Sequence, residues 1–174
     1  MEGYKFGDLS KAFVGFVAKT VCDEDKLLFP VDQFKTETKS YRFLDDLKDD
    51  GGCYGCAFPP AVVHNLFNTS DVYPYICVDP EGLTPDELLA VIHFHGNCYD
   101  IKGTISEAKQ IANATGAYVF APEYPGFGVA PGKSSEHTVN QVADAMLDHV
   151  RNTLPNAKII ISGLSIGAGP AVRL

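Results

Sequence analysis

Residues 158–167 read KIIISGLSIG, and this stretch decides the fold. Its first half, Lys158 to Ser162, is rich in β-branched side chains and predicts a short strand. Its second half fits the pattern G-x-S-x-G, in which a Ser stands on a sharp turn between a strand and a helix. Such a turn exposes the Ser oxygen and brings backbone so close that the flanking residues must be small. We therefore predict that Ser165 is a catalytic nucleophile and that Gly163 and Gly167 support its turn.

A nucleophilic Ser needs hydrogen-bond donors for the negative charge that develops on the substrate carbonyl oxygen. The helix that follows the turn aims its N-terminal N–H groups at that oxygen, and the N–H of Ile166 is the first candidate. This architecture takes a second donor from the loop after the third strand, here residues 95–98. We assign that role to Asn97, and we expect His95 and Gly96 to hold the loop in place.

Upstream of this stretch the hydrophobic pattern predicts four more strands. Leu88 to Phe94 is a near-continuous apolar run, as expected for a strand buried on both faces of a parallel sheet. Ala117 to Ala121 is a second buried strand, and Val62 to Phe67 and Tyr75 to Val78 precede both.

Two helices are predicted between the last three strands. Thr104 and Glu107 form a candidate capping box for the first helix, and Gly116 lies where that helix ends. Ser135 caps the second helix, and Pro155 lies beyond its end. Its apolar stripe consists of Val139, Val142, Ala143, Met146 and Val150. The order strand, helix, strand, helix, strand implies a parallel α/β sheet with right-handed crossovers.

The composition of the chain limits the classes of function that it can have. The chain has 174 residues, 45% of them hydrophobic, which is enough for one core. The net charge of −8 argues against binding to nucleic acid, which requires clustered Lys and Arg. The five cysteines have no framework-like spacing and no signal peptide precedes them, so we expect a cytoplasmic protein. We find no run of apolar residues long enough for a spanning helix.

We predict neither a metal nor a cofactor. His93 and His95 would face one side of a strand, but no Cys, Asp or Glu set completes a metal site around them. Cys53 and Cys56 have C-x-x-C spacing without the second pair that zinc requires. His137 and His149 are expected on the solvated surface of a helix.

The first 60 residues are predicted to form an N-terminal helix and an irregular extension. Apolar residues between Leu9 and Val21 recur at helical spacing. We interpret this helix as packed on the domain. The alternative, peripheral membrane association through the same helix, stays open because lysines flank it and nearby cysteines are candidates for acylation.

Three stretches resemble one branch of the α/β-hydrolase superfamily, which contains eukaryotic protein depalmitoylases and their fungal and plant relatives. Residues 93–97 with Asp100 resemble the branch's H-G-N-x-x-D segment. Residues 123–136 are similar to its D-Y-x-G-Y-G…G-K-x-S-E loop, and residues 163–170 to its G-x-S-I-G-x-x-P elbow. The resemblance extends from Pro74 to Leu174.

This resemblance implies a three-layer α/β/α sandwich with a mostly parallel sheet, and a serine hydrolase or thioesterase that works through an acyl-enzyme. Its substrate would be a small molecule or an acylated protein. In the superfamily the triad Asp and His follow the nucleophile in the chain. We therefore interpret residues 61–174 as the N-terminal half of such a domain, a fragment truncated after the nucleophile elbow and inactive alone. The alternative is a non-catalytic binding or interaction module.

Overall fold

The computed structural model describes residues 61–67, 73–80 and 88–174. The predicted helix between Leu9 and Val21, the Cys53–Cys56 pair and the rest of the 1–60 extension lie outside the described residues. The strands are β1 (Ala61–Asn65), β2 (Pro74–Val78), β3 (Leu89–Phe94), β4 (Tyr118–Pro122) and β5 (Lys158–Gly163). The helices are α3 (Ile101–Thr115), α4 (Glu136–Thr153) and α5 (Ala168–Arg173), and a 3₁₀ turn, η2 (Ser165–Gly167), precedes α5.

These strands form a single mixed sheet in the order β1-β2-β4-β3-β5. β3 pairs in parallel with both β4 and β5, as the alternation of strands and helices predicts. β2 pairs antiparallel with β1 and with β4. The prediction of a parallel sheet therefore holds for β3, β4 and β5, whereas the antiparallel pairs that β2 makes with β1 and β4 render the sheet mixed.

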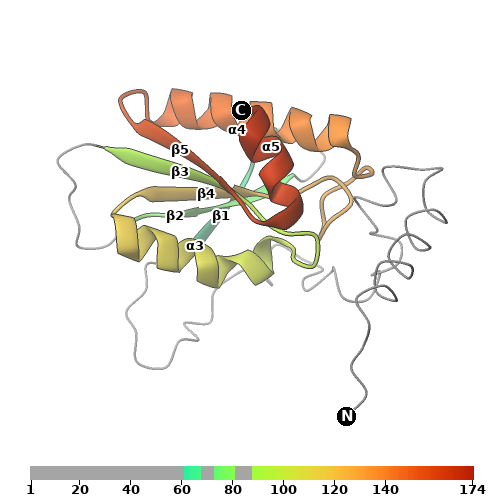
Figure 1. Ribbon diagram of the computed structural model, residues 1–174, viewed down its shortest axis with the longest axis horizontal. Coiled ribbons are helices and arrows are strands. Elements are labelled where there is room, and N and C mark those ends of the chain that lie inside the picture. Colours follow the sequence, from blue (N-terminus) through green and yellow to red (C-terminus); the bar gives the residue numbers. More distant parts are fainter. Residues whose placement is uncertain (1–60, 68–72, 81–87) are drawn as a thin grey trace, which may run out of the picture.

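The sheet lies between two helical layers, with α3 on one face and α4 and α5 on the other (Figure 1). Alternate residues of the strands supply the two cores because successive side chains point to opposite faces. Ile92 and Phe94 of β3 join the core beneath α4, whereas Val91 joins the core beneath α3. The predicted three-layer α/β/α sandwich is confirmed.

Helix α3 begins one turn earlier than the sequence predicts. Its N-cap is Asp100, whose side chain accepts a hydrogen bond from the Gly103 amide, so the proposed Thr104 capping box is wrong. The Thr104 hydroxyl instead donates to the Asp100 carbonyl oxygen at 3.0 Å. The predicted end is confirmed, because Gly116 closes the helix in the left-handed conformation with φ of 67°.

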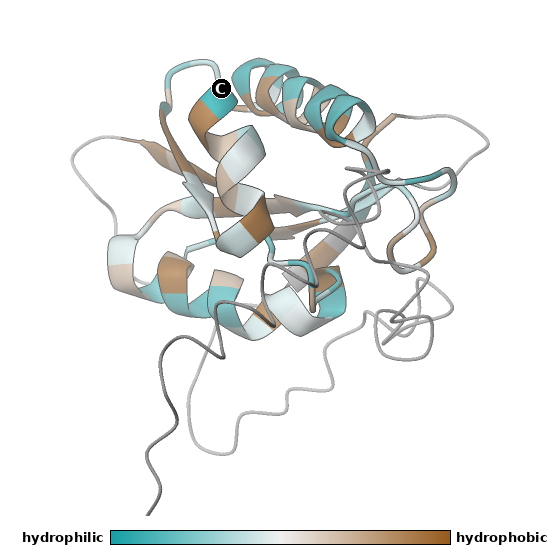
Figure 2. Ribbon diagram, turned by 45° about the vertical axis from the view of Figure 1, so that its right-hand side comes forward, coloured by the Kyte–Doolittle hydropathy of each residue, from teal (hydrophilic) through white to brown (hydrophobic). Residues whose placement is uncertain are grey.

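Helix α4 follows its prediction closely. Ser135 caps it, in a reciprocal hydrogen-bond arrangement with Thr138. Its buried residues are those of the predicted stripe: Val139, Val142, Ala143, Met146 and Val150. In Figure 2 the hydrophilic residues of α4 lie on its outer side, away from the sheet.

We predict that Met146→Ala lowers the free energy of unfolding by about 2–5 kcal/mol, because Met146 is fully buried between α4 and the sheet. Asp148→Ala, at an exposed position on the same helix, should change it by less than about 0.5 kcal/mol. Chemical denaturation followed by circular dichroism measures both. Equal destabilisation by the two variants would contradict the assignment of the helix face.

Candidate active site

The carboxyl ends of β3 and β5 bring two loops together. In the parallel register of these strands His93 lies opposite Ser162 and Phe94 lies opposite Gly163. The amide of Leu164 then donates to the carbonyl oxygen of Phe94 at 2.9 Å. Residues 95–100 and the turn at Ser165 therefore leave the sheet at the same level of the same edge, where ligands bind in open α/β sheets.

Ser165 occupies a strained backbone conformation. Its φ is 53°, and it is the only non-glycine residue with positive φ among the described residues. Such a conformation is uncommon outside glycine, so the surrounding structure must hold it in place. Leu164 supplies part of that restraint, since its carbonyl oxygen accepts a hydrogen bond from the Gly167 amide at 2.9 Å. The side chain of Ser165 is exposed at the tip of the turn.

The two elbow glycines are sterically required. A Cβ atom on Gly163 would lie 2.1 Å from the carbonyl oxygen of Gly167. A Cβ atom on Gly167 would lie 2.2 Å from the carbonyl oxygen of Phe94 and 2.8 Å from that of His95. All three separations are far below a van der Waals contact, and the obstructing atoms belong to the backbone. The turn thus packs directly on the end of β3.

The residues that follow the nucleophile belong first to η2 and then to α5. Ile166 lies in η2, immediately before α5, and is partly buried. Pro170 lies in the first turn of α5, where the missing N–H costs little. At the other end of α5, Arg173 donates to the Asn140 carbonyl oxygen at 3.0 Å and to the Asp144 carboxylate at 2.5 Å. These contacts attach α5 to α4.

Residues 95–100 form the loop that contains the second expected donor, and we call it the 95–100 loop. The Tyr99 amide donates to the Gly96 carbonyl oxygen at 3.2 Å, which closes a tight turn with Asn97 and Cys98 at its centre. Gly96 is buried and Asn97 is partly exposed. A Cβ atom on Gly96 would lie 3.6 Å from Leu164, so this loop is in ordinary contact with the elbow.

A buried carboxylate at the end of β4 organises this loop. Glu123, 1% exposed, accepts hydrogen bonds from the Ile101 amide at 3.1 Å and from the Tyr124 amide at 3.2 Å. Its Oε1 atom also lies 3.0 Å from Nε2 of His95. Glu123 belongs to the 123–136 stretch that resembles a family loop, but this role was not predicted from the sequence. The available signal was an acidic residue directly after a buried strand.

Tyr124 adds a second layer to this cluster. Its hydroxyl donates to the His95 carbonyl oxygen at 2.8 Å, and its ring lies 4.1 Å from the His95 ring, centroid to centroid. Burial, and secondly the charge of Glu123, raise the pKa of Tyr124 well above its usual value. The hydroxyl therefore remains protonated and keeps donating across the physiological pH range.

Four of the five histidines contact residues other than Ser165. All five lie in the described residues. Nε2 of His95 lies 3.0 Å from Oε1 of Glu123 and Nδ1 lies 3.0 Å from the Gly96 carbonyl oxygen, so both ring nitrogens have partners other than Ser165. Nε2 of His93 lies 3.4 Å from Glu107 of α3. Its Nδ1 lies 3.1 Å from the hydroxyl of Ser162 in β5. Desolvation by burial is the main cause that lowers the pKa of His93.

The other three histidines lie on the outer elements. His64 of β1 stacks on Tyr75 with ring centroids 4.9 Å apart. Nε2 of His149 forms a hydrogen bond with the Tyr75 hydroxyl at 2.7 Å, and the side chain is partly buried. The prediction that His149 lies on the solvated surface is therefore wrong. His137 is exposed, as predicted.

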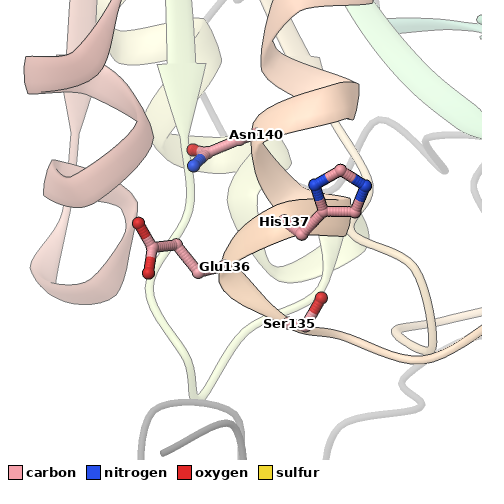
Figure 3. A pocket seen from close by; sticks show the side chains of 4 residues that line it. All are labelled: Ser135, Glu136, His137 and Asn140. Atoms are coloured by element: carbon pink, nitrogen blue, oxygen red, sulfur yellow. The ribbon is translucent and has the colours of Figure 1, made fainter.

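A cavity of about 420 Å³ lies at the N-terminus of α4, lined by Ser135, Glu136, His137 and Asn140. Figure 3 shows Glu136 and Asn140 projecting from one side of the helix and His137 from the other. Asn140 marks the side that α5 contacts, since its carbonyl oxygen binds Arg173. All four lining residues belong to the start of α4 or its cap, and none belongs to the elbow or to the 95–100 loop.

Neither a metal-binding cluster nor a membrane-spanning helix is found within residues 61–67, 73–80 and 88–174. No group of three or more His, Cys, Asp or Glu side chains in these ranges is arranged to hold a metal ion. None of the helices in the same ranges has the length and apolar character that crossing a membrane demands.

Comparison with curated proteins finds similarity over part of the chain. No family model matches the chain. The alpha/beta hydrolase domain-containing protein aho-3 of Caenorhabditis elegans is 29% identical over 92 residues, which make up 52% of this chain and 28% of that protein. The chain thus spans well under half the length of this curated relative.

Solved structures show the same fold at low sequence identity. LAE6, an α/β-hydrolase enzyme from the metagenome of Lake Arreo, has a TM-score of 0.53 at 15% identity, over 74% of this chain and 41% of that one. An esterase of Pyrobaculum calidifontis has a TM-score of 0.52 at 18% identity, over 66% and 39%. A lidless α/β serine hydrolase of Xanthomonas campestris has a TM-score of 0.51 at 16% identity, over 68% and 56%. The chain has the α/β-hydrolase fold.

We predict that Gly167→Ala lowers the free energy of unfolding by about 3 kcal/mol or more, because the new methyl group meets backbone oxygens that have no room to move. Gly169→Ala is the matched control, since a Cβ atom there has nothing within 4 Å. It should leave stability unchanged or raise it by up to about 1 kcal/mol. Chemical denaturation of both variants is the measurement, and a Gly167 variant as stable as the Gly169 variant would refute the close contact.

Proposed function

We propose that this protein is a serine hydrolase that cleaves acyl esters or thioesters with Ser165 as its nucleophile. The observation that carries the proposal is the strained, exposed turn at Ser165, held between β5 and α5. A strained backbone persists only where surrounding structure over-determines it, and such positions concentrate at active sites. The likeness to α/β-hydrolase enzymes supports the reaction class.

In the proposed reaction the Ser165 oxygen attacks the acyl carbonyl carbon and its proton passes to a general base. The carbonyl oxygen becomes negatively charged, and the N–H groups of Asn97 and Ile166 stabilise it. The alcohol or thiol then leaves with a proton and an acyl-enzyme remains. Water hydrolyses that ester and regenerates the Ser hydroxyl. The support is positional, because the 95–100 loop and the elbow are in contact.

We place the acid and base of the triad outside these 174 residues. Four of the five histidines bond or stack with residues other than Ser165, namely His64, His93, His95 and His149. His137, the remaining one, projects from α4 on the side opposite Asn140 (Figure 3). The 174-residue chain on its own is therefore proposed to be inactive, since Ser without a base is a weak nucleophile.

A thioesterase acting on acylated protein is the finer form of the proposal. It rests on the resemblance of residues 93–100, 123–136 and 163–170 to the depalmitoylase branch. Comparing a palmitoylated peptide thioester with short-chain esters, in the full-length protein, tests it. A higher kcat/KM for short-chain esters than for the peptide would assign a different substrate class.

We predict that a fluorophosphonate probe labels the full-length protein and that Ser165→Ala abolishes both labelling and ester hydrolysis, with a loss of several orders of magnitude in kcat. Ser106→Ala, at an exposed position on α3, should react like the wild type. In-gel fluorescence and peptide mapping measure the labelling. Labelling that survives in Ser165→Ala sinks the assignment, and a wild type that neither labels nor hydrolyses any ester favours the non-catalytic alternative.

The oxyanion assignment gives a separate prediction. Asn97 is the second residue of the turn from Gly96 to Tyr99, a position that accepts proline. Asn97→Pro removes the N–H and should lower kcat by about 10²–10³-fold, whereas Asn97→Ala keeps it and should lose far less. Steady-state kinetics on one ester compare them. If both variants lose activity equally, the backbone N–H is not the donor.

A further inference from the structure

We infer that Glu123 is the positioning residue of the oxyanion hole, because its buried carboxylate fixes both ends of the 95–100 loop. This inference rests on the proposed function of that loop. Glu123 itself lies at the carboxyl end of β4, beyond reach of the reacting atoms through any contact that the structure gives, so it acts through the loop.

The two oxygens of the Glu123 carboxylate contact the two ends of the loop, and we call this pair of contacts the clamp. Oε1 of Glu123 holds His95, the first residue of the loop, at 3.0 Å. Oε2 holds the amide of Ile101, the residue directly after the loop, at 3.1 Å. Asn97 lies between the two attachment points, so its N–H direction depends on both. A carboxylate is suited to this because each of its oxygens accepts independently.

The clamp is also anchored to the sheet. The Tyr124 amide donates to Oε1 of Glu123, which fixes the carboxylate against its own strand end. The Glu123 amide donates to the Pro74 carbonyl oxygen at 2.9 Å, which ties the same point to β2. The Tyr124 hydroxyl meanwhile holds the His95 carbonyl oxygen. The loop is thus positioned from β4 as well as from its own strand.

The donors and acceptors of His95 and Glu123 explain why an acid suits this position. The Gly96 carbonyl oxygen only accepts, so Nδ1 of His95 must donate to it. The contact between Nε2 of His95 and Oε1 of Glu123 then requires one further proton, carried by either atom. With that proton the pair is neutral overall, which suits two side chains that are each 1% exposed.

An amide of the same shape does not satisfy these partners. Two backbone amides, those of Ile101 and Tyr124, donate to different oxygens of Glu123. A glutamine offers one acceptor oxygen and one donor NH₂ group, so one of these amides would face another donor. A buried donor left without an acceptor is costly, and we expect the loop to shift to relieve it, because β4 is held by pairing on both sides.

The test compares Glu123→Gln with Asp148→Asn, an exposed acid on α4, in the full-length protein. Glu123→Gln should lower kcat for an ester about 10–100-fold, as expected for a misplaced oxyanion donor, with KM within about threefold of the wild type. Amide hydrogen exchange at residues 97–100 should quicken at least about tenfold, with exchange in β4 unchanged. The Asp148 variant should match the wild type in both measurements.

Unchanged exchange at residues 97–100 in Glu123→Gln overturns the clamp. Faster exchange with unchanged kcat shows that the clamp does not position a catalytic group, and also overturns the inference. A wild type without hydrolase activity overturns the proposed function, while the exchange measurement still judges the clamp. If Glu123→Gln fails to fold, Tyr124→Phe removes only the hydroxyl bond to His95, and the same two readouts must move in the same direction.

Discussion

The backbone contact between Gly167 and the end of β3 is the constraint on which the site depends. With no side chain at Gly167, the carbonyl oxygens of Phe94 and His95 occupy the space where a Cβ atom would stand. The contact places the nucleophile turn and the 95–100 loop at a fixed separation, without any flexible side chain between them. Parallel register between β3 and β5 produces this contact, because it delivers both strand ends to one level of the sheet.

A second constraint is polar. Glu123 and His95 bury a carboxylate and an imidazole where desolvation penalises charge, and the pair persists because its atoms have hydrogen-bond partners. These partners come from the ends of β3 and β4 and from the start of α3. Apolar packing fixes the positions of the layers only coarsely, whereas directional hydrogen bonds fix the orientation of a loop amide. Catalysis requires that orientation.

Local patterns in the sequence predicted most elements because each depends on nearby residues. The buried stripe of α4 matched residue for residue, and Gly116 ended α3 as expected. The start of α3 was placed wrongly, since Thr104 and Glu107 satisfy the capping pattern as text while Asp100 makes the cap. The choice between these two caps depends on where β3 ends and on the contact between Glu123 and the Ile101 amide. A short window of sequence does not contain this information. His149 was misplaced for the same reason, because its partner Tyr75 belongs to a distant strand.

The sequence by itself determined the alternation of strands and helices, the strand-to-helix turn and the identity of its Ser, because period, β-branching and two small residues are properties of neighbouring positions. Only the tertiary structure decided that the sheet is mixed and that Ser165 takes a positive φ. It also decided that Glu123 joins both ends of the loop beside the nucleophile. These features arise from strands far apart in the chain meeting at one edge, and the strength of a hydrogen bond depends on distances and angles that residue types do not encode.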